Sequence, residues 1–253
     1  MNIYVLLKQT FDTEEKVIIS GGSIDEEGAK FVINPYDEYA VEEAITLRDE
    51  HGGKVTLVSV GPDRTIEALR TGLAMGADEA VLINDERIPA DENAVSKVLH
   101  GYLSSQQADL IIGGNFSVDN GAGQVAIRVA NLLGIPHVSS ITKITVSGSH
   151  ATAERDAEGD LEVVQVALPA VFTAQQGLNE PRYPSLQGNY EGKKKPLTEL
   201  NLDDLELDPP AAKTERTELT LPPERKAGRI LSGETPDQVK ELVQLLRSEA
   251  KVI

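Results

Sequence analysis

Short apolar runs alternate with longer segments of helical periodicity through the first half of the chain. The runs are rich in branched side chains and lie at 3–7, 55–60, 80–83 and 110–112. Continuous apolar runs of this length are typical of strands that are buried on both faces of a parallel sheet. The alternation therefore predicts an α/β fold, in which a Rossmann-like parallel sheet carries helices on both faces.

Prolines, glycines and capping residues mark the ends of the predicted helices. Asn34-Pro35 predicts a helix start, because proline suits the first helical position, and Gly52-Gly53 ends that helix. Asp91 is a candidate N-cap for a later helix. Gly134 and Pro136 predict that the helix after the fourth run ends in a left-handed cap.

Two other regions have β-prone patterns. Segments 16–19 and 31–33 are expected to pair as a small hairpin near the N-terminus. After residue 136, segments 141–146, 151–154 and 161–167 follow one another closely, with a turn sequence before the last. They predict a small antiparallel appendage to the parallel sheet.

The last part of the chain differs from the rest in composition. Residues 196–233 contain Pro209-Pro210 and Pro222-Pro223 but few core-type side chains, which predicts an extended arm lying on another surface. A capping-box sequence at 235–238 then introduces a final amphipathic helix.

A glycine-rich loop at 113–123 connects the fourth apolar run to the next predicted helix. In open α/β sheets this geometry places backbone N–H groups and a helix N-terminus at the carboxyl edge of the strands, where a phosphate can bind. A plain βα turn is the equally weighted alternative. The chain lacks GxGxxG and GxxxxGK motifs, so neither a dinucleotide fingerprint nor a P-loop is predicted.

Charge and composition narrow the possible functions. The chain has 24 basic and 41 acidic residues and a net charge of −17, which argues against nucleic acid and anionic membranes as partners. It has no cysteine, so thiol chemistry and disulfides are excluded. No signal peptide or stretch long enough for a membrane span is visible, and we expect a cytoplasmic protein without membrane insertion.

Sequence signals for catalysis are also missing. The four histidines lie far apart without metal-site spacing, and no GxSxG, HExxH or kinase motif occurs. We therefore predict no metal site and no catalytic residue. A binding or carrier protein is favoured over an enzyme.

Three longer segments resemble the β subunit of electron transfer flavoprotein. They are LPAVFTAQQGLNEPRYPSLQGNYEGKKKP from Leu168, FVINPYDEYAVEEA from Phe31 and LRTGLAMGADEAVLI from Leu69. The resemblance implies an adenine nucleotide α-hydrolase-like domain that binds AMP and forms a heterodimer with an α subunit holding FAD. It also implies electron donors such as the acyl-CoA dehydrogenases of fatty acid β-oxidation, and a membrane quinone oxidoreductase as acceptor.

The nucleotide-binding residues follow from this resemblance. They are Leu6, Asn34, Pro35, Tyr36, Asp37, Val60, Gly114, Asn115, Phe116, Ser117, Val118, Asp119, Asn120, Gly121, Ala122, Gly123, Gln124 and Val125. The family's loop often reads GxQAIDxDxxQ[TV]G, and Asp119, Gln124 and Val125 match it. The positions that depart from it are Phe116, Ser117, Gly121 and Ala126. These departures argue against the family's side-chain contacts but still allow backbone N–H groups to bind a phosphate. AMP is favoured, and a bifurcating type with a second FAD is the alternative.

The resemblance also implies a docking loop for the dehydrogenase at 184–195. Its residues are Tyr183, Pro184, Ser185, the protruding Leu186, and the lysines Lys193, Lys194 and Lys195. Without the resemblance, a leucine folded onto its own loop is the alternative. Relatives often carry Pro-x-x-Met-Lys where this chain has residues 187–191, so the partner is expected to differ.

We expect two parts: an α/β nucleotide-binding domain at 1–191, and an arm with a helix at 192–253 that packs on the partner subunit. A free-standing nucleotide-binding sensor domain is the competing hypothesis, but it has no need of such an arm. A nucleotide-hydrolysing enzyme is a third hypothesis, disfavoured by the missing catalytic motifs.

Overall fold

The computed structural model describes residues 1–223 and 227–253. The α/β part begins with strands β1 (Asn2–Leu6), β6 (Lys54–Val60), β7 (Glu79–Ile83) and β8 (Leu110–Gly114). Its helices are α1 (Pro35–His51), α2 (Thr65–Met75), α3 (Glu92–Leu103) and α4 (Val125–Leu133). The chain continues through β9 (His137–Ser147), β10 (His150–Ala157), β11 (Asp160–Ala167), β12 (Ala170–Ala174), α5 (Leu186–Gly192) and β13 (Leu197–Leu200).

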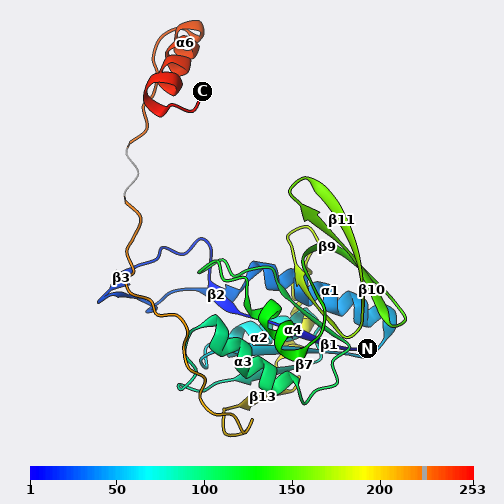
Figure 1. Ribbon diagram of the computed structural model, residues 1–253. Coiled ribbons are helices and arrows are strands. Elements are labelled where there is room, and N and C mark those ends of the chain that lie inside the picture. Colours follow the sequence, from blue (N-terminus) through cyan, green and yellow to red (C-terminus); the bar gives the residue numbers. More distant parts are fainter. Residues whose placement is uncertain (224–226) are drawn as a thin grey trace.

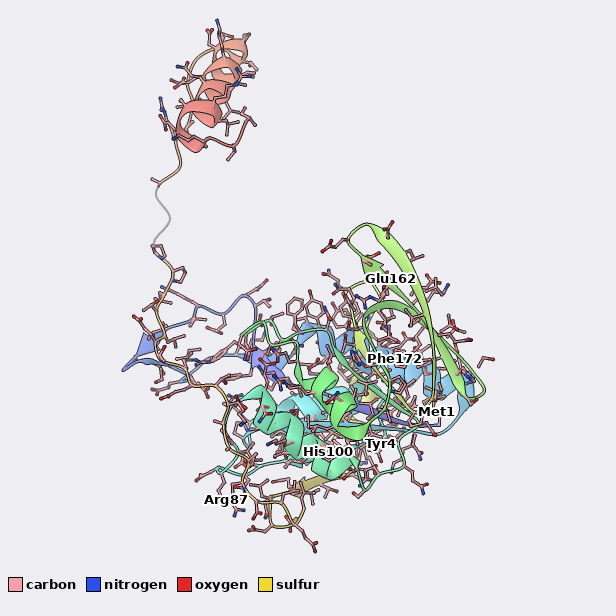
Figure 2. The ribbon with its side chains drawn as sticks, in the orientation of Figure 1. Met1, Tyr4, Arg87, His100, Glu162 and Phe172 are labelled. Atoms are coloured by element: carbon pink, nitrogen blue, oxygen red, sulfur yellow. The ribbon has the colours of Figure 1, made fainter. Side chains whose placement is uncertain are left out.

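These strands form one nine-stranded sheet in the order β11-β10-β9-β12-β8-β1-β6-β7-β13. The pairs from β9 through β12 and β8 to β13 are parallel, whereas β9, β10 and β11 pair antiparallel. The predicted appendage is therefore a continuation of the main sheet. Its hairpin projects from the body, with Glu162 near the end, while Phe172 lies in the interior (Figure 2).

Helices cover both faces of the sheet, as the apolar runs predict. Ile3 and Val5 of β1 pack into a core with α1 and α2, whereas Tyr4 and Leu6 face a second core with α3 and α4. Successive side chains of a strand point to opposite faces, so a run that is apolar throughout supplies both cores. The α/β fold class is confirmed.

Two helix ends illustrate how local sequence sets the elements. Asp91 caps α3 by accepting a hydrogen bond from the Ala94 N–H at 2.9 Å. Gly134 ends α4 with φ 67° and ψ 28°, the left-handed conformation in which a side chain is disfavoured.

The predicted N-terminal hairpin has different partners. Strand β5 (Phe31–Ile33) pairs with β2 (Gln9–Phe11). Strand β3 (Ile19–Ser20) pairs with β4 (Ser23–Ile24) across Gly21-Gly22. The prediction was wrong because it joined 31–33 to the nearest preceding β-prone segment. The chain instead closes a short β3–β4 turn first and brings Phe31 against Phe11, with ring centroids 4.6 Å apart.

The first part of the predicted arm packs on the protein itself. Leu197–Leu200 forms β13, parallel to β7 at the sheet edge, and Leu202 is fully buried in the core beneath α3. The Thr214 N–H donates to Asp91 at 3.0 Å, which holds the chain beside α3. Leu197–Leu200 and Leu202 therefore join the protein's own sheet and core, whereas the sequence predicted an arm lying on another surface. Residues 224–226 of the arm lie outside the described residues.

The final helix α6 (Thr235–Leu245) continues into a π-helical turn at Leu246–Ala250 and has no buried residue. It stands away from the α/β body in Figure 1. The predicted capping box does not form: the N-cap is Glu234, and the Gln238 amide donates to the Gly233 carbonyl at 3.0 Å.

Candidate functional site

The proposed nucleotide residues gather at the carboxyl ends of three neighbouring strands. β8, β1 and β6 lie side by side and run parallel, so Gly114, Leu6 and Val60 end at one edge of the sheet. The turn at 34–37 starts α1 beside the same edge. This is where open α/β sheets place their ligands.

Asn34 and Asp37 are buried at this edge and tie three segments together. The Asp37 carboxylate accepts the backbone N–H groups of Lys8 at 2.7 Å and Gly114 at 2.9 Å. It also accepts the Asn34 amide at 3.1 Å. One carboxylate thus fixes the chain after β1, the start of α1 and the end of β8.

Asn34 extends this network into the glycine-rich loop. Its side-chain amide donates to the Phe116 carbonyl at 3.0 Å, and its side-chain oxygen accepts the Val118 N–H at 3.2 Å. Asn34 is the N-cap residue of α1 but makes no side-chain cap hydrogen bond, because its amide and its oxygen bind Asp37 and the loop instead. The loop backbone is therefore shaped by residues some 80 positions earlier in the chain.

Gly114 is a glycine because no side chain fits there. A Cβ atom at this position would collide with the Asp37 carboxylate and with Tyr36. The N–H of Gly114 can approach the carboxylate only when the position lacks a Cβ. Gly114, the last residue of β8, therefore serves the close approach of two backbone segments.

The loop tip folds on itself through Ser117 and Asn120. Ser117 donates its hydroxyl to the Asn120 side-chain oxygen at 2.6 Å, and its N–H donates to the Ala122 carbonyl at 2.9 Å. Asn120 also accepts the Ala122 N–H at 3.0 Å. Ser117, one of the departures from the family's loop sequence, is thus used in hydrogen bonds within the loop.

Lys8 closes the site from the end of β1. Its ammonium group forms an ion pair with Asp119 at 2.7 Å and donates to Ser117 Oγ at 3.3 Å. Lys8 was missing from the predicted residues, although its position two residues past the end of β1 is a signal that places it at the ligand edge. It brings a cation to an edge where a phosphate is expected.

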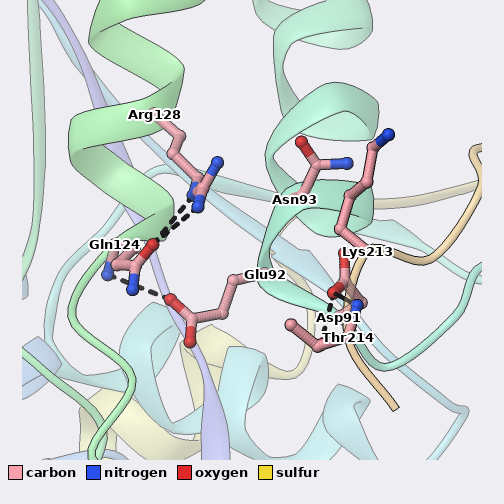
Figure 3. A pocket seen from close by; sticks show the side chains of 7 residues that line it. All are labelled: Asp91, Glu92, Asn93, Gln124, Arg128, Lys213 and Thr214. Atoms are coloured by element: carbon pink, nitrogen blue, oxygen red, sulfur yellow. Dashed lines mark hydrogen bonds between the residues drawn. The ribbon is translucent and has the colours of Figure 1, made fainter.

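The N-terminus of α4 favours negative charge. No side chain caps it, and the Gln124 N–H donates to a Glu92 carboxylate oxygen at 3.2 Å (Figure 3). The guanidinium of Arg128 donates to the Gln124 side chain at 2.7 Å. The amides of the first helical turn have no partner within the helix. An anionic oxygen already at this helix end fits the phosphate chemistry that the loop predicts.

The cavity in Figure 3 has a volume of about 110 Å³. It lies between α3, α4 and the chain at 213–214, and Gln124 is its one lining residue from the predicted set. Ligand pockets for nucleotide-sized molecules are roughly 300 Å³ or more. This cavity is therefore a neighbour of the predicted site and is too small to hold the whole nucleotide.

Aromatic rings flank the loop at the opposite end. Tyr36 and Phe116 have ring centroids 4.2 Å apart at an interplanar angle of 40°. Both are partly buried. Aromatic faces of this kind pack against planar groups such as a nucleobase.

Burial changes the acidity of Asp37. Loss of hydration raises the pKa of its carboxyl group to about 7, although the hydrogen bonds from Lys8, Asn34 and Gly114 favour the charged form and act in the opposite direction. The network is thus built on a group that titrates near neutral pH.

The predicted docking residues lie on and beside the short helix α5, where a loop was expected. Ser185 caps α5 by accepting the Gly188 N–H at 2.9 Å. Tyr183 and Leu186 are 94% and 93% exposed, so both side chains protrude from the surface. Leu186 does not fold back onto its own segment.

The segment before α5 is attached firmly to α1. Arg182 donates to both carboxylate oxygens of Glu42, at 2.7 and 2.8 Å, and Asn179 donates to Glu43 at 2.9 Å. Burial raises the pKa of Glu42, but the hydrogen bonds and the positive charge of Arg182 together outweigh this effect and hold the pKa below its usual value. Sequence reasoning missed this contact, because Glu42 and Glu43 look like ordinary solvated helix residues.

The three lysines after α5 do not share one environment. Lys193 and Lys194 are exposed, and the Lys194 ammonium lies 3.8 Å from the centroid of the Tyr190 ring. Lys195 turns toward α2 and donates to the carbonyls of Leu73 and Ala77. Only two of the three lysines therefore belong to the outer surface.

Comparisons with known proteins agree with this architecture. A family model described as "Electron transfer flavoprotein domain" matches residues 21–205. The "Electron transfer flavoprotein subunit beta" of Bacillus subtilis (strain 168) is 56% identical, with 100% of both chains covered.

The chain belongs to the electron transfer flavoprotein β-subunit family.

Other members of the electron transfer flavoprotein β-subunit family cover the chain equally well. The "Electron transfer flavoprotein subunit beta" of Syntrophomonas wolfei is 38% identical and covers 100% of this chain and 98% of its own. The "Electron transfer flavoprotein subunit beta, mitochondrial" of Oryza sativa subsp. japonica is 35% identical, with 100% of both chains covered. The resemblance inferred from the sequence is confirmed.

Among the described residues of this β-subunit family member, no helix is long and apolar enough to cross a bilayer. Within the same residues, no group of three or more histidine, aspartate or glutamate side chains is arranged to hold a metal ion. The roles assigned to the nucleotide and docking residues stay predictions.

Proposed function

We propose that the protein is the β subunit of a heterodimeric electron transfer flavoprotein that carries electrons and has no catalytic residue of its own. Its α subunit would hold the FAD, which supplies the redox chemistry. Electrons would come from flavoenzymes of the acyl-CoA dehydrogenase type and pass to a membrane quinone oxidoreductase, with the heterodimer in the cytoplasm. Family membership along the whole chain is the observation that carries this proposal.

The β subunit would hold one AMP at the carboxyl edge of β8, β1 and β6. Gly114–Val125 would wrap the phosphate, with the first-turn amides of α4 as donors and Lys8 as the nearby cation. Leu6, Val60 and the Tyr36–Phe116 pair would contact the nucleoside. Asn34 and Asp37 would shape the loop from beneath, because their polar atoms are already bonded to it.

Nucleotide analysis of the heterodimer tests this assignment. Denaturing the purified complex is expected to release one AMP and one FAD per heterodimer. Release of two FAD would indicate the bifurcating alternative, and release of neither AMP nor a second FAD would overturn the site assignment.

The α5 region would dock onto the dehydrogenase through Leu186. Its side chain is 93% exposed at the start of α5, beside Tyr183 and near the cations Lys193 and Lys194. Redox encounters are brief and use small interfaces, so one apolar anchor can supply much of the affinity. Positive charges beside it would attract an acidic rim on the partner.

Leu186→Ala provides the matching test. Removing about three methylene-sized groups at ~0.8 kcal/mol each weakens docking by roughly 2 kcal/mol, or about 30-fold. We expect a raised apparent KM for reduction by the dehydrogenase, with unchanged AMP, FAD and heterodimer content. An unchanged kcat/KM would show that Leu186 has no docking role.

The α subunit would cover the apolar side of α6. Val239 and Leu242 are 55% and 47% exposed, and no residue of α6 is buried. Exposed apolar side chains spaced along one helix favour a partner surface. The β subunit alone is therefore expected to self-associate, and a stable monomer by ultracentrifugation that gains no stability from the α subunit would contradict this.

A further inference from the structure

Helix α5 lies directly against α2, at unusually short range. Gly188 and Gly192 both face Ala74 in the last turn of α2, and a Cβ atom at either position would collide with the Ala74 backbone. Two glycines four residues apart lie on one face of a helix. This face allows the backbones of α5 and α2 to touch.

Two cationic side chains form hydrogen bonds across this contact, one from each side. Lys195 follows α5, and its ammonium group donates to the Leu73 carbonyl at 3.0 Å and to the Ala77 carbonyl at 2.6 Å. Arg70 belongs to α2, and its guanidinium donates to the Gly192 carbonyl at 2.9 Å and to the Lys195 carbonyl at 2.7 Å. Arg70 from α2 and Lys195 from the chain after α5 thus each bind two carbonyl groups at or just past the end of the other helix.

The position of two of these acceptors strengthens their hydrogen bonds, because the Leu73 and Gly192 carbonyls belong to the last turns of α2 and α5. The last carbonyl groups of a helix lack helical partners and carry its partial negative charge, so a cation there is favoured. Lys195 is partly buried, and desolvation lowers its pKa, which marks it as a group withdrawn from the outer surface. Lys193 and Lys194 remain exposed, which separates them from Lys195 in role.

We propose that Lys195 and Arg70 are positioning residues for dehydrogenase docking, which fasten α5 to α2 and so set the direction in which Leu186 points. This inference rests on the proposed docking function of Leu186. It assigns Lys195 to the attachment of α5 instead of to direct contact with the partner, and it adds Arg70, which lies 116 positions before Leu186 in the sequence. Neither side chain touches the partner.

Lys195→Met and Lys194→Met form a matched pair of variants in the assembled heterodimer. Both remove one positive charge from adjacent positions, so long-range attraction changes equally. We expect Lys195→Met to raise the apparent KM for reduction by the dehydrogenase roughly tenfold, as for the loss of a charged hydrogen-bond donor. The increase persists at high salt, and kcat at saturation is unchanged.

Lys194→Met is expected to raise KM only a few-fold at low salt, and the increase disappears near 0.5 M salt as the Debye length falls to about 4–5 Å. Lys195→Arg, which retains donors for both carbonyls, restores KM to within about twofold of the wild-type value. Arg70→Met, made in case Lys195→Met folds poorly, reproduces the salt-independent increase. Amide hydrogen exchange at residues 186–192 accelerates in Lys195→Met and Arg70→Met but not in Lys194→Met.

Identical, salt-sensitive KM changes in Lys195→Met and Lys194→Met would overturn the inference, because Lys195 would then act as a surface charge. Unchanged exchange of α5 in both Lys195→Met and Arg70→Met would also overturn it. Leu186→Ala serves as the reference: if it leaves kcat/KM unchanged, the docking function itself fails. If it raises KM while Lys195→Met behaves as Lys194→Met, only the positioning role fails.

Discussion

The glycine-rich loop after β8 and the segment around α5 are both held onto the α/β body by polar contacts, but the groups that hold them differ in charge. Asp37 and Asn34 are the buried groups that hold the loop: both accept its N–H groups, and Asn34 also donates to the Phe116 carbonyl. The α5 segment is held by donors, since Arg182 binds a carboxylate and Lys195 binds carbonyl groups. One attachment depends on a buried carboxyl group, and the other on cations that keep their charge at neutral pH.

This difference teaches that the two attachments respond to different perturbations. A buried carboxyl group with a raised pKa titrates within the physiological range. Guanidinium and ammonium groups do not, so they keep their hydrogen bonds across the same range. The loop region is therefore expected to be sensitive to pH, and the α5 region to the removal of single donors.

Asp37→Asn tests the pH sensitivity and has the largest expected effect. The pKa of Asp37 is about 7 in the folded protein and lower in the unfolded chain, so the folded state keeps the proton longer as pH rises. The free energy of unfolding therefore falls between about pH 4 and 7, by up to roughly 4 kcal/mol for this group alone. Urea unfolding across this range measures it. The difference between wild type and variant should change with pH, and a constant difference would show that Asp37 does not titrate there.

Gly114→Ala disrupts the attachment of the glycine-rich loop sterically. The added methyl group would displace the Asp37 carboxylate and Tyr36, so the loop must shift. We expect a loss of about 2–3 kcal/mol of stability, together with loss of AMP from the heterodimer. Gly228→Ala is the control, because a Cβ atom there meets open space. Full AMP content in Gly114→Ala would contradict the role of this backbone in the site.

Arg182→Met breaks the attachment of the segment before α5. Glu42 would keep a side chain that is only 10% exposed while losing its charged partner. Because Arg182 itself is 41% exposed, the expected loss is about 1–2 kcal/mol, less than for a fully buried pair. Thermal unfolding measures it. Adding Glu42→Gln should recover part of the loss, and no recovery would mean that packing of the arginine stem matters more than its charge.

Ser185→Ala is the smallest perturbation and affects α5 alone. The Ser185 hydroxyl accepts the Gly188 N–H, and loss of such an N-cap costs about 1 kcal/mol of helix stability. We expect faster amide exchange at residues 186–192 with unchanged global unfolding. Ser147→Ala, at an exposed position of β9, is the control. Equal rates of amide exchange in both variants would show that the contact of α5 with α2 is enough to maintain the helix.

Much of the site could be predicted because it depends on order along the chain. The apolar runs place Leu6, Val60 and Gly114 at strand ends, and neighbouring parallel strands bring those ends to one edge. Asn34-Pro35 marks a helix start beside them. These features follow from local pattern and general topology.

The missed contacts depend on pairings that are distant in sequence. Nothing local predicts that Lys8 pairs with Asp119, or that Glu42 binds Arg182 at a separation of 140 residues. Helix α5 was missed because Gly188 and Gly192 lower helix propensity. Those glycines are required for the approach to Ala74, so tertiary packing overrides the propensity. β13 was missed because a short strand at a sheet edge has little sequence signal of its own, and only its pairing with β7 defines it.

The pairing of β13 with β7 also has a consequence for the entropy of the chain. The stretch from 175 to 196, which includes α5, leaves the sheet at β12 and returns to it at the far edge. Both of its ends are therefore tied to one rigid frame, and the entropy lost in closing such a loop, which grows only slowly with its length, is lost when the protein folds. A partner that binds at α5 meets a segment already ordered, so little further entropy is lost on association. Cutting the chain between β12 and α5 would leave every hydrogen bond of the sheet intact. It would nevertheless restore conformational entropy to the segment that carries α5.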